Sequence, residues 1–509
     1  MRPEVSRSKR VTPQKQAIPP EARAVLEKLQ KAGFEAYVVG GCVRDLLLVE
    51  EPDDWDVATS ATPEQIQKLF PNSFYENKFF TVTVLTGSKD PHLKEIEVTT
   101  FRAEFDYADR RRPGKVEYVK SIEEDLSRRD FTVNAIALSP WLGLGAPRPS
   151  QGKLRILDPF GGQKDLKARI IRAVGTPEER FKEDALRMLR AARFVSTLGF
   201  AIEEKTKKAI SKNAGLLREI SAERIRDELE KLILGEKPME GIEELRELGL
   251  LRFIIPELEQ GYGVTQNKHH IYTVWEHNLL ALQYAVKNNW SLEVRLASLL
   301  HDVGKPKVKK GEGPNATFHG HEVVGARMAE KMLERLKFPK KQIEKIVDLV
   351  RYHLFYYNVD EVTESSVRRL VRNIGKENIE DLLRVRMADR IGSGVPKAEP
   401  YKLRHLRYVI ERVQKDPISA KMLKINGSDI MKLGNIAPGP KVGYLLNILL
   451  GEVLEDPRKN TKKELEKRTK ELLSLSEAEL LRLSKKAKEA AQQVETKQDE
   501  MSKQKYWIS

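Results

Sequence analysis

The chain is poor in cysteine, because Cys42 is the only one among its 509 residues. A single cysteine excludes an intrachain disulfide and fits a reducing compartment, so we expect a cytoplasmic protein. Long apolar runs are missing too, since no stretch reaches the roughly 18 residues that a membrane span needs. Residues 1–20 carry arginine and lysine but no apolar segment, which predicts a basic arm and no signal peptide.

Acidic residues are outnumbered by basic ones. The chain has 90 Lys and Arg against 75 Asp and Glu, a formal net charge of +15. Such an excess favours a polyanionic partner, and it supports nucleic acid binding only modestly by itself. With 40% hydrophobic and 32% charged residues, the composition is typical of a globular protein, and the length allows several domains.

The most informative stretch begins with the apolar run Ala36–Val39, which predicts a buried strand. The strand is expected to end in a tight turn at Gly40 and Gly41, and a helix is expected over 42–48. Because glycine has no Cβ, phosphate oxygens can approach the backbone N–H groups of such a turn. Cys42, beside the turn, is interpreted as a small buried residue.

A second strand is predicted to begin near Trp55, with Asp54 and Asp56 on one face because side chains alternate along a strand. Two carboxylates held this close repel each other unless a divalent cation lies between them. Glu97, in a further strand predicted over 95–101, is either a third carboxylate of this site or an exposed strand residue.

In this order, the strand, glycine pair, helix and Asp-x-Asp resemble the head domain of the class II tRNA nucleotidyltransferase and poly(A) polymerase family. The resemblance implies that Asp54 and Asp56 are catalytic and hold two Mg²⁺ ions. One ion would lower the pKa of the RNA 3′-hydroxyl, and the other would stabilise the departing pyrophosphate. It also implies a set of residues that bind the triphosphate: Gly40, Gly41, Arg44, Arg129 and Asn134.

Ser127–Leu138 is a second matching motif, with its charge concentrated at one end. Arginine forks such as Arg128 and Arg129 suit a triphosphate, and the Asp130 carboxylate suits ribose hydroxyls. Taken alone, the motif is also compatible with surface ion pairs. The preceding segment 102–119 is rich in arginine and is either a solvated loop or, as in the family, a mobile basic loop beside the site.

A helix is predicted over 177–200, in which Asp184 and Arg187 lie one turn apart. The pair is either an ordinary ion pair or a reader of base edges, with the carboxylate accepting from cytosine N4 and the guanidinium donating to ring acceptors. The family resemblance favours the second interpretation, selection of CTP and ATP without a template. Arg190 and Arg193 of the same motif are further nucleotide-binding candidates.

A second group of residues combines four of the nine histidines with two aspartates in apolar helical patterns: His277, His301, Asp302, His321, His353 and Asp389. A single such histidine is more often a core residue, but imidazole and carboxylate together are ligands for first-row divalent metals. The arrangement resembles the HD-domain metal phosphohydrolase superfamily. His277, His301, Asp302 and Asp389 match its basic metal set, and the resemblance implies phosphatase or cyclic phosphodiesterase activity. His321 and His353 could extend it to two metals.

We therefore expect an α+β fold, with a small mixed-sheet nucleotidyltransferase head followed by mostly α-helical neck, body, HD and tail regions. The expected boundaries are 1–24 for the basic arm, 25–160 for the head, 161–265 for the helical neck and body, 266–395 for the HD domain and 396–509 for a tRNA-binding tail. In the tail, a helix start at Gly439-Pro-Lys is either a phosphate site or a plain turn. Helical periodicity fades after Ala491.

The predicted function is template-independent addition of CMP, CMP and AMP to tRNA 3′ ends from CTP and ATP. Mg²⁺ in the head and an unidentified divalent metal in the HD domain are the expected cofactors, and no membrane partner is expected. Addition of A only, of CC only, or of poly(A) are alternatives; the full-length 102–119 segment disfavours the CC-only form. An RNA-binding HD phosphohydrolase with an inactive head is an alternative of another class, which the intact Asp54 and Asp56 disfavour. The sequence does not give the oligomeric state.

Overall fold

The computed structural model describes residues 18–76, 81–105, 115–119, 121–139, 155–267, 271–359, 361–414, 420 and 423–507. These residues divide between two compact units. The first is 1–353 together with 384–395, and the second is 354–383 together with 396–509. Within the described part of the chain, no helix is both long enough and apolar enough to cross a bilayer.

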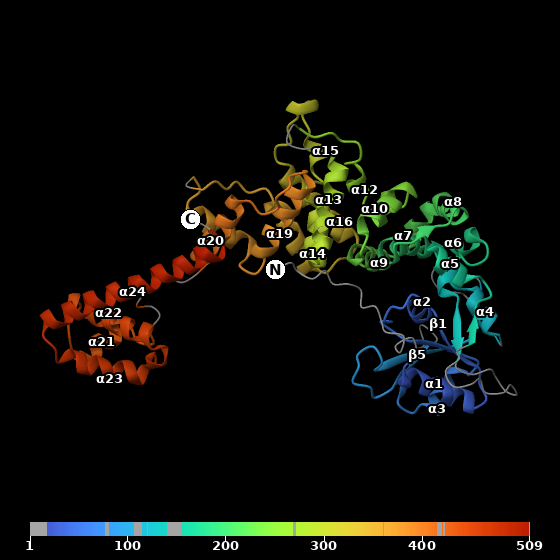
Figure 1. Ribbon diagram of the computed structural model, residues 1–509, viewed down its shortest axis with the longest axis horizontal. Coiled ribbons are helices and arrows are strands. Elements are labelled where there is room, and N and C mark those ends of the chain that lie inside the picture. The colour runs from blue at the N-terminus through green and yellow to red at the C-terminus, as the bar shows by residue number, and fades with distance from the viewer. Residues whose placement is uncertain are drawn as a thin grey trace. The chain divides into compact units, whose positions relative to one another are not determined.

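The strands gather in the N-terminal part of the first unit (Figure 1). A seven-stranded mixed sheet has the order β3-β4-β5-β2-β1-β8-β9, and two-stranded sheets form from β6 with β7 and from β10 with β11. The strands are β1 (Ala36–Val39), β2 (Asp56–Thr59), β3 (Ser73–Glu76), β4 (Thr81–Leu85), β5 (Glu95–Thr100), β6 (Arg102–Phe105), β7 (Lys115–Tyr118), β8 (Ala137–Ser139), β9 (Arg155–Leu157), β10 (Ile170–Ile171) and β11 (Ala201–Ile202). The expected α+β fold, a small mixed sheet followed by helices, is confirmed.

Helices make up most of the rest of the first unit. They are α1 (Pro20–Lys31), α2 (Gly41–Leu47), α3 (Pro63–Leu69), α4 (Ile122–Ser127), α5 (Gly162–Ala168), α6 (Pro177–Glu183), α7 (Leu186–Leu198), α8 (Glu204–Asn213), α9 (Ala222–Leu234), α10 (Pro238–Glu247), α11 (Leu251–Ile254), α12 (Pro256–Glu259), α13 (Val274–Lys287), α14 (Leu292–Leu300), α15 (Lys305–Val308), α16 (His321–Arg335), α17 (Lys340–Tyr352) and the 3₁₀ helices η2 (Thr132–Asn134), η3 (Ala214–Glu219) and η4 (Gly313–Asn315). Helix α19 (Ile379–Gly392) contributes its residues from 384 onward to this unit.

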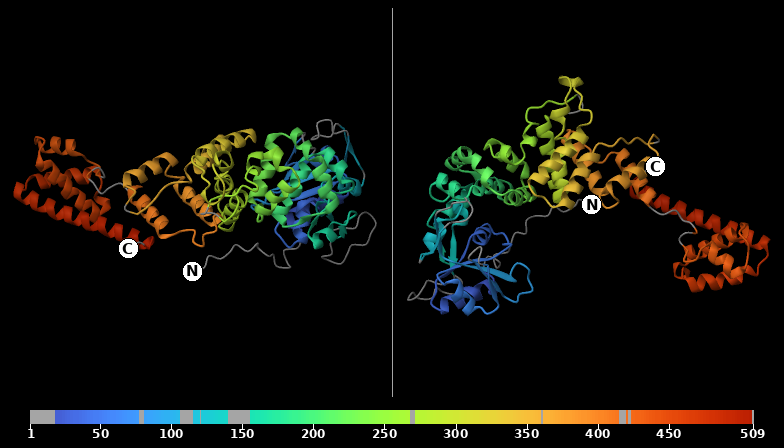
Figure 2. Two further views of the ribbon diagram at one scale, coloured as in Figure 1. Left: turned by 90° about the horizontal axis from the view of Figure 1, so that it is seen from above. Right: turned by 180° about the vertical axis from the view of Figure 1, so that it is seen from behind.

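The second unit is helical. It contains α18 (Glu364–Ile374), α20 (Tyr401–Gln414), α21 (Gly427–Gly434), α22 (Pro440–Glu455), η6 (Pro457–Lys459), α23 (Lys462–Leu473) and α24 (Glu477–Lys505). Figure 2 shows α21 to α24, in orange to red, as a bundle. Buried aliphatic side chains such as Ile430, Leu445 and Leu472 form its core.

The central strands follow from their sequence. The residues of β1 are almost all buried, and β1 pairs antiparallel with β2, placing Val39 opposite Asp56. Strand β2 pairs in parallel with β5, so that Asp56 lies beside Glu97. Helix α3 begins at a capping box, in which Thr62 and Gln65 satisfy each other's backbone N–H groups. Strands β1, β2 and β5 match strands that the sequence predicts.

Several expected elements were wrong. The segment 102–119, where a loop was expected, has the paired strands β6 and β7 at its two ends; its residues 106–114 lie outside the described residues. The helix expected over 177–200 is interrupted because Asp184 has extended backbone angles. Helix α24 continues to Lys505, past the point where helical periodicity fades.

Candidate nucleotidyl-transfer pocket and metal centre

Three carboxylates meet where β2 and β5 run side by side. Asp56 begins β2, and Glu97 is its partner on β5. Asp54 is exposed and lies in the bend before β2, so the expectation that it belongs to the strand was wrong. Burial, together with the neighbouring carboxylates of Asp54 and Glu97, raises the pKa of Asp56 to about 7, although Arg129 opposes the rise. Burial and Asp54 likewise raise the pKa of Glu97.

The electrostatics of these carboxylates test whether a divalent cation fits here. The raised pKa values of Asp56 and Glu97 indicate crowded acceptors with too little positive charge around them. A hard divalent cation takes oxygen ligands of this kind and would remove the repulsion. Asp54 and Asp56, with Glu97 beside them, therefore fit a site for Mg²⁺.

Gly40 joins the carboxylates to the arginines of the head. Its φ of +84° lies in the left-handed region, which favours glycine. A Cβ at this position would lie 2.9 Å from Arg129 Nη1 and 3.2 Å from Asp56 Oδ2. Only a residue without a side chain lets these two groups come so close to the turn, which continues through Gly41 into α2.

Cys42 has no role in this chemistry. Its side chain is completely buried and its thiol lies 3.1 Å from the Val39 carbonyl oxygen, to which it donates. Burial raises the pKa of the Cys42 thiol far above its usual value, and the nearby Asp56 carboxylate adds to the rise. The residue is a packing residue, as expected from its place beside the glycine turn.

A chain of charged and amide side chains leads from α2 to α7. Arg44 donates to Asn134 at 3.0 Å, and the Asn134 amide donates to Asp130 at 3.1 Å. The other Asp130 oxygen accepts from Arg190 at 2.7 Å. Burial alone would raise the pKa of Asp130, but Arg190 and Asn134 outweigh burial and lower it to about 2. Asp130 is therefore held as an anion next to the pocket.

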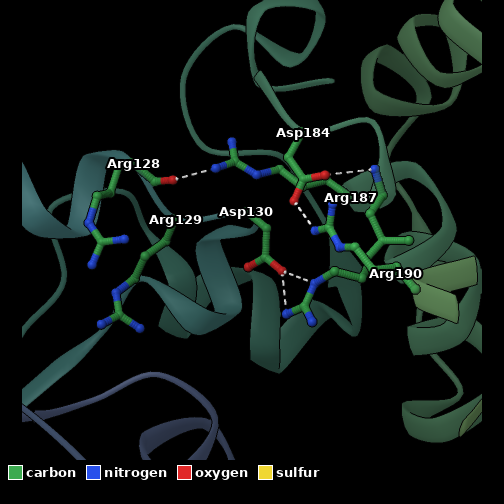
Figure 3. A pocket seen from close by; sticks show the side chains of 8 residues that line it. Arg128, Arg129, Asp130, Asp184, Arg187 and Arg190 are labelled. Atoms are coloured by element: carbon green, nitrogen blue, oxygen red, sulfur yellow. Dashed lines mark hydrogen bonds and ion pairs between the residues drawn. The ribbon is translucent and has the colours of Figure 1, made fainter. Parts of the chain in front are cut away.

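The pocket beside this chain has a volume of about 300 Å³ (Figure 3). Its lining is dominated by arginine: Arg128, Arg129, Asp130, Asp184, Leu186, Arg187, Arg190 and Arg224. Five of the expected nucleotide-binding residues are among them. The others, Gly40, Gly41, Arg44, Asn134 and Arg193, are not part of the lining. A cavity lined by this many guanidinium groups suits a polyphosphate ligand.

Asp184 and Arg187 both line the pocket, but their side chains have other partners. Asp184 follows the last residue of α6, and its carboxylate accepts from Leu186 N and from Arg224 Nη2. The Arg187 guanidinium donates to the Glu183 carboxylate at 2.8 Å and to the Arg128 carbonyl oxygen at 3.0 Å. The interruption between α6 and α7 separates two side chains that one continuous helix would have kept on one face.

Two residues of α9 that the sequence did not single out belong to this region. Arg224 lines the pocket, and Glu228, which is 4% exposed, pairs with Arg193 at 3.2 Å and Arg190 at 3.6 Å. Burial and the neighbouring Arg190 lower the pKa of Arg193 to about 10, and Glu228 opposes them. Helical spacing places Arg224 and Glu228 on one face, but no sequence signal connects them with partners about 40 residues earlier.

A separate cluster brings together all six residues expected in the HD region. His277, His301, Asp302 and Asp389 each offer one ligand atom, and these atoms lie within 4.8 Å of one another; Asp302, His321 and His353 form an overlapping second group. All six side chains are buried. The Nε2 atoms of His277 and His301 are 2.8 Å apart, and Asp302 Oδ2 lies 3.0 Å from His277 Nε2.

The orientation of three of the rings fits metal binding. His301, His321 and His353 each place Nδ1 at 2.7–2.8 Å from the carbonyl oxygen three residues earlier. An Nδ1–H that donates to a carbonyl leaves the Nε2 lone pair for a cation, and such a hydrogen bond fixes the ring. The three Nε2 atoms face the Asp302 carboxylate at 3.2–3.7 Å.

The charge of the cluster also fits a cation. Burial would lower the pKa of His301, but Asp302 and Asp389 outweigh burial and raise it to about 10. The two buried carboxylates favour positive charge beside them, and a proton on His301 or a divalent ion can add to the charge that Lys305 and Arg386 already bring. Lys305, which the sequence did not single out, is buried and lies 2.5 Å from Asp302 Oδ2. The donor set is suitable for a first-row divalent metal.

Comparison with known families assigns the same regions. Residues 36–172 match the family described as the poly A polymerase head domain. Residues 199–261 match a probable RNA- and SrmB-binding site of polymerase A, and residues 274–392 match the HD domain.

Several proteins similar to this chain are CCA-adding enzymes. The CCA-adding enzyme of Lactobacillus delbrueckii subsp. bulgaricus is 36% identical over 443 residues, which cover 87% of this chain and 95% of the relative. The CCA-adding enzyme of Limosilactobacillus reuteri is 47% identical over 239 residues, 47% of this chain and 55% of the relative. The crystal structure of the Bacillus stearothermophilus CCA-adding enzyme in complex with CTP aligns with a TM-score of 0.58 at 30% identity, covering 89% of this chain and 98% of that one. The chain belongs to the family of CCA-adding enzymes.

Proposed function

We propose that this chain adds C, C and A to the 3′ end of tRNA, using CTP and ATP and no nucleic-acid template. The observation that carries the proposal is the meeting of Asp56 and Arg129 at Gly40, which places the carboxylates next to an arginine-lined pocket. Nucleotidyl transfer needs a cation site and a triphosphate site side by side. Membership of a family whose relatives are CCA-adding enzymes supports the choice of substrates.

In this proposal the chain supplies position and charge, and the RNA supplies the nucleophile. Asp54 and Asp56, with Glu97 as a third candidate, would hold Mg²⁺, which supplies activation of the 3′-hydroxyl and neutralisation of phosphate charge. Arg129 and the glycine turn bind the triphosphate. Asp130, held ionised by Arg190, accepts hydrogen bonds from the ribose.

The base would be selected at the far end of the pocket. Asp184 accepts from the exocyclic amino group that cytosine and adenine share, and Arg187 supplies the facing positive charge. Uracil and guanine present a carbonyl oxygen at that place and are rejected. Arg44, Asn134 and Arg193 were expected to bind the nucleotide, but they are not part of the pocket lining. In this proposal they instead hold Asp130, Arg190 and the pocket wall in position.

The direct test uses a tRNA that ends before its CCA sequence. With labelled CTP and ATP supplied separately and together, we expect two cytidines from CTP alone and a complete CCA from the mixture. Incorporation of adenosine alone, arrest after CC, or long adenosine tails would instead identify the A-adding, CC-adding or poly(A) alternative.

Variants of the carboxylates test the head. Asp54→Ala and Asp56→Ala should each abolish incorporation while tRNA binding, measured by gel shift, persists, because they remove metal ligands and leave the basic surface intact. Asp53→Ala is the matched control, since Asp53 is an exposed neighbour outside the site. Undiminished turnover in either site variant would refute the metal assignment.

The six-residue cluster supports a second activity, hydrolysis of a phosphate ester or a 2′,3′-cyclic phosphate by the HD domain. The combined change of His301→Ala and Asp302→Ala should remove hydrolysis of a 2′,3′-cyclic nucleotide and leave CCA addition unchanged. His319→Ala is the control, because His319 is exposed and does not belong to the cluster. Loss of CCA addition in the double variant would make the cluster structural. A cytoplasmic location and the tRNA-binding role of the tail stay predictions.

A further inference from the structure

The base-reading carboxylate is held by a residue outside its own motif. Asp184 is the residue after α6, with φ −141° and ψ 104°. Its backbone is extended, so the direction of its side chain is not fixed by a helix. Its Oδ1 accepts from Leu186 N at 3.1 Å, and its Oδ2 accepts from Arg224 Nη2 at 2.7 Å. The ion pair is largely shielded, because the two side chains are 18% and 21% exposed.

Arg224 comes from α9, 40 residues farther along the chain, and its guanidinium belongs to the pocket lining. Its Nη1 is buried and has no hydrogen-bond partner among the described residues. A buried donor without a partner is costly unless a ligand or water satisfies it. Arg187 cannot replace Arg224 as the partner of Asp184, because its own donors are engaged by Glu183 and the Arg128 carbonyl oxygen.

We infer that Arg224 is a specificity-determining positioning residue, which holds the Asp184 carboxylate in the one orientation that accepts an amino group and repels a carbonyl oxygen. The inference rests on the proposed function. A fixed carboxylate rejects uracil and guanine because it cannot turn away from their O4 or O6. Released from Arg224, it turns on its extended backbone and tolerates those bases.

The test is the ratio of kcat/KM for CTP to that for UTP, measured on tRNA lacking CCA with the full-length chain. In Arg224→Gln the ratio should fall at least about tenfold. An intact site rejects a base that leaves its buried polar groups unpaired, and this rejection amounts to far more than tenfold. Arg224→Lys keeps a cation beside Asp184 and should recover most of the ratio.

Arg226→Gln is the matched control. Arg226 is on the same helix and its side chain is 22% exposed, but it pairs with Asp227 and donates to the Lys337 carbonyl oxygen, outside the pocket. Its variant should keep the wild-type ratio. In an Asp184→Asn background, Arg224→Gln should add no further change, because it acts through that carboxylate.

A fall in kcat/KM by the same factor for CTP, ATP and UTP in Arg224→Gln would overturn the inference and leave Arg224 a structural or phosphate-binding residue. If that variant does not fold, as judged by thermal melting, Arg224→Met takes its place and must show the same loss of discrimination. Failure of the wild-type chain to add CTP would instead refute the proposed function, so the two failures are distinguishable.

Discussion

Among single residues, Asp56 has the most consequential protonation state. Burial and the neighbouring carboxylates raise its pKa to about 7, so a proton competes with a cation for it near neutral pH. At pH 6 about a tenth of such a group is ionised, and at pH 8 about nine tenths is. Since a raised pKa means that the folded state holds the proton more tightly, the metal-free head loses stability as pH rises toward 7.

The Mg²⁺ dependence of CTP incorporation should therefore shift with pH. The Mg²⁺ concentration for half-maximal rate is expected to be about tenfold higher at pH 6 than at pH 8, because the proton must leave Asp56 first. Titrations of Mg²⁺ at the two pH values, with the tRNA and CTP concentrations fixed, measure this. An identical half-maximal concentration at both pH values would contradict the raised pKa.

The residues that could be predicted from the sequence are those with local signals. Asp56 and Gly40 follow from a strand pattern and a turn, and the HD cluster follows from histidines in apolar helices. Arg224 and Lys305 could not be predicted, because their importance comes from partners that the fold brings to them. Asp54 was expected inside a strand, but it lies in the bend after the Pro52-Asp53 break.

Among the elements, α5 and η2 are in close contact near the site. A Cβ on Gly162 would lie 2.2 Å from the Thr132 carbonyl oxygen and 2.7 Å from Ile136 Cγ1. Because η2 carries Asn134, the backbone of α5 fixes the turn that orients Asp130. A small side chain at this contact would push the turn out of place.

Gly162→Ala should lower the free energy of unfolding by about 1–3 kcal/mol, the usual cost of overpacking, and should also slow CTP addition. Gly215→Ala is the matched control, since a Cβ there meets nothing within 4 Å. Denaturant unfolding of both variants, with addition rates measured alongside, tests the contact. Equal stability of the two variants would show that the backbone relaxes without cost.

The elements also show where sequence patterns fail. Apolar periodicity predicts one helix over 177–200. The positions of the apolar residues do not reveal that a single residue between two helices, Asp184, is extended. By contrast β1 was predicted closely, because an apolar run that ends at two glycines is a local signal.

For the whole molecule, the six-residue HD cluster should couple metal binding to the stability of the part that contains it. Removing divalent ions with EDTA should lower the melting temperature, and Mn²⁺ should restore it, because a cation at 100 times its Kd contributes about 2.7 kcal/mol. Asp389→Asn should weaken this response, since Asp389 Oδ1 lies 3.4 Å from His277 Nε2. Calorimetry with the transitions fitted separately measures it, and an undiminished response in the variant would place the metal elsewhere.

The buried thiol of Cys42 has a practical consequence. The chain contains no other sulfhydryl group, and this one is sealed inside the head and stays protonated. A maleimide dye will therefore react only with cysteines introduced by design on the exterior. One such position in each compact unit would give a donor and acceptor pair, with which single-molecule fluorescence could follow the enzyme through the three successive additions.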